Sequence, residues 1–139
     1  KYYAGDDNLR DTRFNGKYLF RFTGGKEFKV VKDRKTTLLG LNISSIYRGG
    51  FRKSHGQFVL FSPFDSGVYS EKLKDYFRTD IRIYWKWNKP KRSTTLAIDI
   101  QNITNTKNEA FESFDQIQSK LTLKKQLGMI PNLSYKLEF

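Results

Sequence analysis

Five polar residues are the strongest candidates for chemistry in this chain of 139 residues. Two are carboxylates, two are arginines and one is an amide, and all lie on the polar side of alternating segments. They are Arg78, Asp80, Arg82, Asp99 and Gln101. Acid–base catalysis needs two carboxylates with separated pKa values. The nearby arginines favour the ionised form of both Asp80 and Asp99, so we do not interpret them as a catalytic pair. The cluster is expected either to contact a substrate or plug inside a pore, or to form cross-strand ion pairs.

No other side chains indicate an enzyme. The chain has no cysteine and a single histidine, His55, which lies in a long irregular segment. A structural zinc site needs several Cys or His ligands, and a hydrolytic triad needs a nucleophile beside its base. The pairs Gly24-Gly25 and Gly49-Gly50 lack the spacing of a phosphate-binding loop. We therefore expect no catalytic residue, no metal site and no cofactor.

Two alternating segments must position the candidate residues. Along residues 77–87, one parity is Phe, Thr, Ile, Ile, Trp and Trp, whereas the other is Arg, Asp, Arg, Tyr and Lys. Residues 96–100 place Leu, Ile and Ile on one parity in the same way. Since successive side chains of a strand point to opposite faces, each segment has one apolar and one charged face. Residues 88–93 contain a proline and no apolar residue, which predicts a turn and therefore a hairpin.

The whole chain predicts an all-β fold of about five antiparallel strands joined as up-and-down hairpins. The strands are expected near residues 17–31, 36–48, 76–88, 93–103 and 123–139. Long loops are expected at residues 49–75 and 104–122, so short and long connections alternate. Because the strands are antiparallel, all short turns then lie at one end of the sheet and all long loops at the other.

Bacterial outer-membrane barrels combine that asymmetry of loops with apolar residues outside, polar residues inside and aromatic residues at both membrane interfaces. We therefore expect these strands to belong to a transmembrane β-barrel. Its lipid-facing residues would be Ile81, Ile83, Trp85, Trp87, Leu96, Ile98 and Ile100. Five strands are too few to close, since single-chain bacterial barrels begin at eight strands. We expect the chain to be a fragment or processed part of a longer protein, because it begins at Lys1.

The net charge of +12 admits nucleic acid, a membrane surface or a larger assembly as the partner. Proteins that stack nucleobases on a sheet present their rings and cations on the same face. Here Trp85 and Trp87 have the opposite parity to Arg82 and Lys86. We therefore expect no nucleic-acid partner, although a soluble basic β-sheet module that binds nucleic acid or polysaccharide remains the alternative. An adhesin-like or non-transporting barrel fragment is a third possibility.

Several segments resemble the C-terminal part of TonB-dependent outer-membrane receptors of the kind found in Bacteroidetes. The similar segments are YRGG at residues 47–50, YFRTDIRIYW at 76–85, LAIDIQNITN at 96–105 and QLGMIPNLSYKLEF at 126–139. The chain ends in an aromatic residue, as such receptors do. In those receptors the last strand is read by the barrel-assembly machinery, and the corresponding positions here are Tyr135, Leu137 and Phe139.

The resemblance implies the C-terminal barrel portion of a receptor for nutrient uptake in the bacterial outer membrane. Such a barrel has about 22 strands and a plugged lumen. The implied partners are outer-membrane lipid, the rest of the barrel and its plug, the barrel-assembly machinery and a nutrient ligand. An inner-membrane energy transducer would act through an N-terminal region that lies outside this chain.

Overall fold

The computed structural model describes residues 1–3, 8–32, 35–54 and 69–139, and it is all-β within them. The strands are antiparallel wherever their pairing is defined. In chain order they are β1 (Tyr2–Tyr3), β2 (Leu9–Arg10), β3 (Leu19–Lys32), β4 (Lys35–Arg48), β5 (Arg52–Lys53), β6 (Glu71–Lys72), β7 (Tyr76–Lys89), β8 (Arg92–Gln101), β9 (Glu109–Asp115), β10 (Lys120–Lys125) and β11 (Ile130–Glu138).

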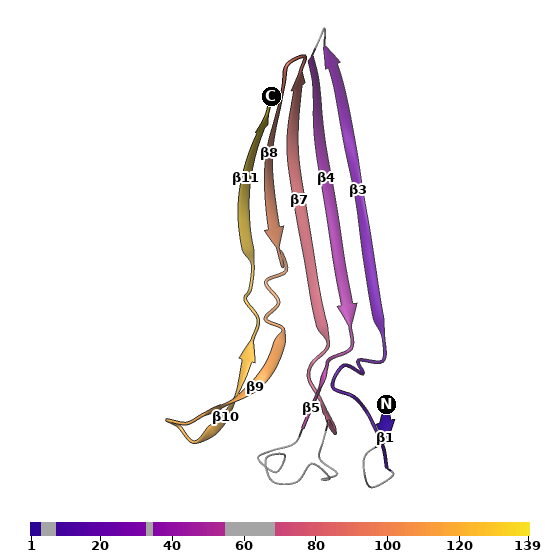
Figure 1. Cartoon of the computed structure of the whole chain (residues 1–139), viewed down its shortest axis with the longest axis vertical. Helices are drawn as coiled ribbons and strands as arrows, with labels where there is room; N and C mark the ends of the chain where they lie inside the picture. Colours follow the sequence, from indigo (N-terminus) through magenta and orange to yellow (C-terminus); the bar gives the residue numbers. More distant parts are fainter. Residues whose placement is uncertain (4–7, 33–34, 55–68) are drawn as a thin grey trace. The chain divides into compact units, whose positions relative to one another are not determined.

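The five long strands form one sheet in the order β11-β8-β7-β4-β3 (Figure 1). The predicted all-β class and the predicted five-stranded antiparallel sheet are therefore confirmed. The sheet is open: β11 and β3 are its two edges, and the described strands form no closed barrel. Three two-stranded sheets accompany it, made by β1 with β2, β5 with β6, and β9 with β10.

Three of the expected segments differ from the structure. The expected loop 104–122 contains β9 and the start of β10, which pair as a hairpin. The expected last strand, 123–139, is divided: residues 123–125 complete β10, and β11 begins only at Ile130. The expected loop 49–75 contains the short strands β5 and β6, whereas His55 and residues 56–68 lie outside the described residues.

The structure divides into two compact units. The first consists of Lys1–Phe20, Tyr47–Phe77 and Lys107–Leu127, and the second of Arg21–Ile46, Arg78–Thr106 and Gly128–Phe139. The second unit contains most of the long sheet, and the first contains the three small sheets. All five polar candidates therefore belong to the second unit.

Little of the described chain is buried. Leu73 and Ala97 are the buried apolar side chains among the described residues. Large apolar side chains on β3, β4 and β11 are exposed instead, and Leu133 on β11 is 69% exposed. A soluble domain buries most of its large apolar side chains, so this sheet carries an apolar face that the described chain does not cover.

Candidate polar face of the long sheet

Strand register in the second unit separates apolar from polar side chains. β7 and β8 pair so that apolar residues of β7 lie directly opposite apolar residues of β8. The opposed pairs are Ile81 with Ile100, Ile83 with Ile98, and Trp85 with Leu96. Directly opposed residues project to the same face of a sheet. The residues predicted to face lipid on these two strands therefore share one face.

β11 extends the same face to the sheet edge. Leu133 pairs with Ile98, Tyr135 with Leu96, and Leu137 with Thr94. Trp87 also pairs with Thr94 and is 38% exposed. Phe139 follows the end of β11. The residues of the expected assembly signal thus continue the apolar series of β8, with Tyr135 and Leu137 inside the strand.

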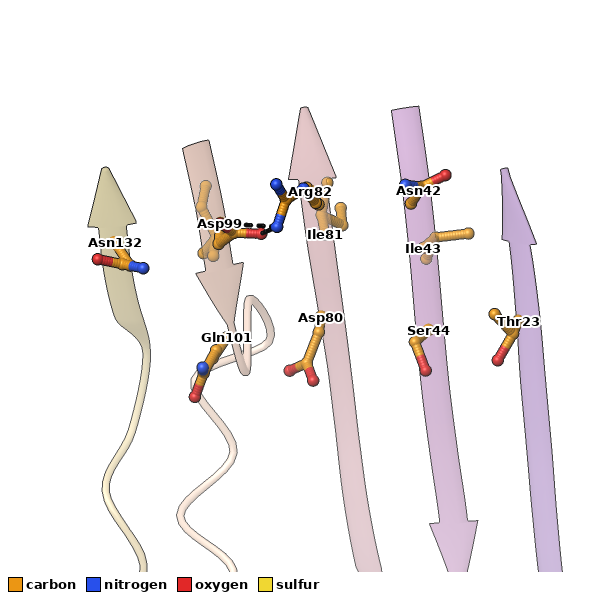
Figure 2. Close-up of a pocket in the computed structure, with 11 residues that line it drawn as sticks. Thr23, Asn42, Ile43, Ser44, Asp80, Ile81, Arg82, Asp99, Gln101 and Asn132 are labelled. Atoms are coloured by element: carbon orange, nitrogen blue, oxygen red, sulfur yellow. Dashed lines mark hydrogen bonds and ion pairs between the residues drawn. The ribbon is translucent and has the colours of Figure 1, made fainter. Parts of the chain in front are cut away.

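The opposite face carries the charged residues. Arg82 lies opposite Asp99, and Asp99 lies opposite Asn132, which forms one polar row across β7, β8 and β11. The Arg82 Nη1 atom donates to Asp99 Oδ1 at 3.3 Å and to Oδ2 at 3.4 Å. Figure 2 shows this pair, with the Asn132 side chain on the adjacent strand.

The remaining pair of charged candidates is held more tightly. Arg78 donates from Nε to Asp80 Oδ1 at 2.7 Å and from Nη2 to Oδ2 at 2.9 Å. The Asp80 Oδ1 atom also accepts the backbone N–H of Asn102 at 2.8 Å. This N–H follows the end of β8, where Asn102 adopts a φ of 53°. Asp80 therefore fixes the chain as it leaves the sheet, a contact that alternation in the sequence does not reveal.

A shallow concavity of about 400 Å³ lies over this polar face (Figure 2). It brings together four of the five candidates, Asp80, Arg82, Asp99 and Gln101, with amide and hydroxyl side chains. The added polar residues are Thr23, Asn42, Ser44 and Asn132. The ion pairs compensate the charges here, so the surface offers neutral hydrogen-bond donors and acceptors. It suits contact with water or a polar surface rather than proton transfer.

Tyr84 is a polar-face residue that sequence reasoning did not select. Its ring lies over Gly40 on β4, where an added Cβ atom would come within 2.1 Å of the ring. Its hydroxyl donates to Glu27 Oε1 on β3 at 2.7 Å. Opposite Tyr84 on β8 is Ala97, which is 0% exposed. The glycine within the alternating segment of β4 was the available signal, because a strand glycine often marks close approach by another group.

Arg82 and Asp99 are expected to couple only weakly. The Arg82 side chain is 47% exposed, and exposed or cross-strand ion pairs contribute about 0.2–1 kcal/mol. We expect a double-mutant cycle of Arg82→Ala and Asp99→Ala to give a coupling energy within that range. Urea unfolding in detergent would measure it. A coupling of several kcal/mol would instead indicate a desolvated, specialised pair.

The first unit contains a tighter polar network around Asp75. The Asp75 carboxylate accepts hydrogen bonds from Lys72 Nζ at 2.8 Å, from the Gly50 N–H at 3.1 Å and from the Tyr18 hydroxyl. The Tyr47 hydroxyl lies 3.3 Å from Asp75 Oδ2. The ammonium group of Lys72, followed by Tyr18 and the Gly50 N–H, lowers the pKa of Asp75 well below its usual value. The hydrogen bond that the Tyr18 hydroxyl donates to Asp75 raises the pKa of Tyr18.

The Asp75 network predicts a specific pH dependence. Because the folded pKa is lowered, ionised Asp75 stabilises the fold above its unfolded pKa of about 3.9, and this stabilisation is lost as the pH falls below that value. We expect the stability of the wild type, measured as its denaturation midpoint, to decrease below about pH 4, and Asp75→Asn to show a smaller change over the same range. Denaturation midpoints measured between about pH 2 and about pH 7 test this dependence. Equal acid dependence in both proteins would contradict it.

Asn108 and Lys53 connect the β9–β10 hairpin to other segments of the first unit. Asn108 is 5% exposed, and its side chain accepts the Phe77 N–H at 3.0 Å and donates to the Phe77 carbonyl oxygen at 2.8 Å. Lys53 on β5 pairs with Glu112 on β9 and with Glu71 on β6, the latter at 3.1 Å. Its hydrogen bond to Glu112 raises the pKa of Lys53. These contacts give the expected long loop a defined attachment.

Within the part of the chain that the structure describes, no group of three or more His, Asp or Glu side chains could hold a metal ion. No helix there is long and apolar enough to cross a membrane. Comparisons of the chain with protein-family models, with curated proteins and with solved structures found no match. The resemblance to TonB-dependent receptors therefore rests on the sequence segments that carry it.

Proposed function

We propose that this chain is the C-terminal barrel portion of an outer-membrane TonB-dependent receptor that takes up a nutrient. The observation that carries the proposal is the strand register of β7, β8 and β11. It aligns Ile83, Ile98 and Leu133 on one face and Arg82, Asp99 and Asn132 on the other. Lipid outside and a water-filled lumen inside require this two-sided arrangement.

The exposed apolar face supports a lipid partner. Leu133 is 69% and Tyr135 is 67% exposed on β11, and Phe22 is 61% exposed on β3. Contiguous apolar surface of this kind is unfavourable in water and marks a membrane or protein contact. β3, β4 and β7 each have 14 residues, more than the roughly 9–11 that a tilted strand needs to cross a bilayer.

The open edges support membership of a larger barrel. β3 and β11 each have a neighbour on one side only within the described sheet. Backbone N–H and C=O groups inside a bilayer must be satisfied, so a transmembrane sheet has to close on itself. The proposal therefore requires further strands, which the resemblance supplies as a barrel of about 22 strands.

In the proposed receptor, ligand binds at the outer loops and the plug, and energised movement of the plug opens the lumen. The polar face would then form part of the lumen wall. Its ion pairs, Arg82 with Asp99 and Arg78 with Asp80, compensate four of the charges on that wall. This chain contributes wall and loops rather than a catalytic group, so no enzymatic activity is proposed.

Fractionation of native cells tests the proposal. We expect the protein in the outer-membrane fraction, resistant to high salt and extracted only by detergent. We also expect the coding sequence upstream of Lys1 to encode a signal peptide, a plug and further alternating hairpins. A protein that stays soluble without detergent and binds oligonucleotides in a salt-sensitive manner would instead support the basic binding module.

A further inference from the structure

We propose that one end of the long sheet is a basic rim that binds the phosphate headgroups of anionic phospholipid. The inference deepens the proposed function, because it names a partner for the membrane-facing sheet. We define the basic rim as Lys35, Lys89, Lys91 and Arg92. Lys35 begins β4, whereas Lys89 ends β7, Lys91 lies in the turn, and Arg92 begins β8.

Topology gathers these four cations. β4 and β7 are neighbours in the antiparallel sheet, as are β7 and β8, so the start of β4 lies at the same end as the β7–β8 turn. Lys89 and Arg92 pair directly across that turn. Figure 1 shows the start of β4, the end of β7, the start of β8 and the C-terminus at this end of the sheet.

The rim cations are available to a partner. All four residues are exposed. None of them forms an ion pair with a carboxylate of a described residue, whereas the nearby Lys136 is paired with Glu138 at 2.6 Å. Directly opposed like charges such as Lys89 and Arg92 repel each other. An anion bound between them would relieve that repulsion.

The position of the rim identifies the class of anion. Trp87 is the last apolar residue of β7, and it lies two residues before Lys89. Thr94 on β8 pairs with Trp87 on one side and with Leu137 of β11 on the other. A band of Trp and aliphatic side chains directly beside exposed Lys and Arg is typical of a surface at the membrane interface, where the cations meet lipid phosphates. Lys89 and Arg92 lie on the same face as Trp87, and that face continues as the aliphatic series Ile83, Ile98 and Leu133, which suits lipid chains and offers no polar groups to contact bases.

Vesicle flotation tests the rim with two lipid compositions. The probes are vesicles of neutral phosphatidylcholine and vesicles that also contain anionic phosphatidylglycerol. Each cation at an anionic surface strengthens binding by about fivefold, so three or four engaged cations give about a hundredfold or more. We expect the full chain to bind the anionic vesicles more strongly by that factor, and the preference to shrink at high salt.

A matched pair of variants separates the rim from overall charge. The rim variant carries Lys35→Gln, Lys89→Gln, Lys91→Gln and Arg92→Gln. The control variant removes four exposed cations elsewhere: Lys107→Gln, Lys120→Gln, Lys124→Gln and Lys125→Gln. Both lose the same net charge, and circular dichroism in detergent checks that both are folded. We expect the rim variant to lose most of the preference for anionic vesicles and the control variant to keep most of it.

Several outcomes would overturn the basic rim. Equal losses in the two variants, or no preference in the wild type, would overturn the rim. Loss of oligonucleotide binding in the rim variant without loss of lipid binding would assign the rim to nucleic acid and also overturn it. The neutral vesicles test the membrane proposal separately: failure to insert there counts against the barrel, whereas insertion without an anionic preference counts only against the rim.

Discussion

Replacing Leu133 with arginine is expected to destabilise the lipid-embedded protein by about 2–4 kcal/mol. An arginine on the lipid face of a transmembrane barrel costs this much near the bilayer midplane. Leu133 pairs with Ile98, which pairs with Ile83, so it lies within the apolar face of three strands. In water the same substitution should have almost no effect, because Leu133 is 69% exposed and exposed substitutions usually change stability by less than about 0.5 kcal/mol. A large loss of stability therefore indicates that this face contacts lipid, and a negligible loss indicates that it contacts water.

The adjacent residue provides the control for Leu133→Arg. Ser134 pairs with Ala97 and points to the opposite face, where Tyr84 also lies. A wet lumen tolerates a charge there, so we expect Ser134→Arg to cost much less than Leu133→Arg in lipid. Urea titration of folding into vesicles measures both variants. Equal costs, or a negligible cost for Leu133→Arg, would contradict a lipid-facing sheet.

Alternation in the sequence was sufficient to predict β4 and β7. Residues 76–88 were expected as a strand, and β7 spans Tyr76–Lys89. Residues 36–48 were expected as another, and β4 spans Lys35–Arg48. A two-residue period reflects the geometry of one strand and its two environments, so it can be read locally. It also predicts which residues share a face once a hairpin has been recognised.

The β9–β10 hairpin was missed because its pattern is weak and its support comes from distant residues. Phe114 lies opposite Leu121, but the next pair on the same face combines Glu112 with Leu123, and Phe111 lies opposite Lys124. One local signal was available: Asp115 Oδ1 accepts the N–H groups of Ile117 and Gln118, which is a typical turn contact of aspartate. The contacts that attach the hairpin connect residues far apart in sequence, such as Lys53 with Glu112.

The candidate site was predictable in its composition and only partly in its geometry. Parity placed Arg82 and Asp99 on one face, but it could not show that they lie directly opposite each other, because the register depends on the turn. It also could not show that Asp80 pairs with Arg78 and accepts the Asn102 N–H. That contact depends on the positive φ of Asn102, which follows from the local backbone path.

Gly49→Ala is expected to destabilise the first unit by about 3 kcal/mol or more. Gly49 is buried, and its N–H donates to the Tyr18 carbonyl oxygen at 3.1 Å. A Cβ atom on Gly49 would lie 1.8 Å from the Gly16 carbonyl oxygen, which is backbone and cannot rotate away. Overpacking usually costs about 1–3 kcal/mol, and a backbone clash held in place by a hydrogen bond belongs at or above the upper end.

Gly24→Ala is the matched control, because it adds the same methyl group to another glycine of the chain. The nearest atom to a Cβ on Gly24 is the ring Cζ of Phe22 at 3.1 Å, and an exposed side chain can move by a few tenths of an ångström. We expect a change of less than about 1 kcal/mol, since loss of freedom in the unfolded chain offsets the small clash. Urea unfolding in detergent and protease resistance compare the two variants. Unfolding of Gly49→Ala at the same urea concentration as Gly24→Ala would contradict the close contact between the backbones of Gly16 and Gly49.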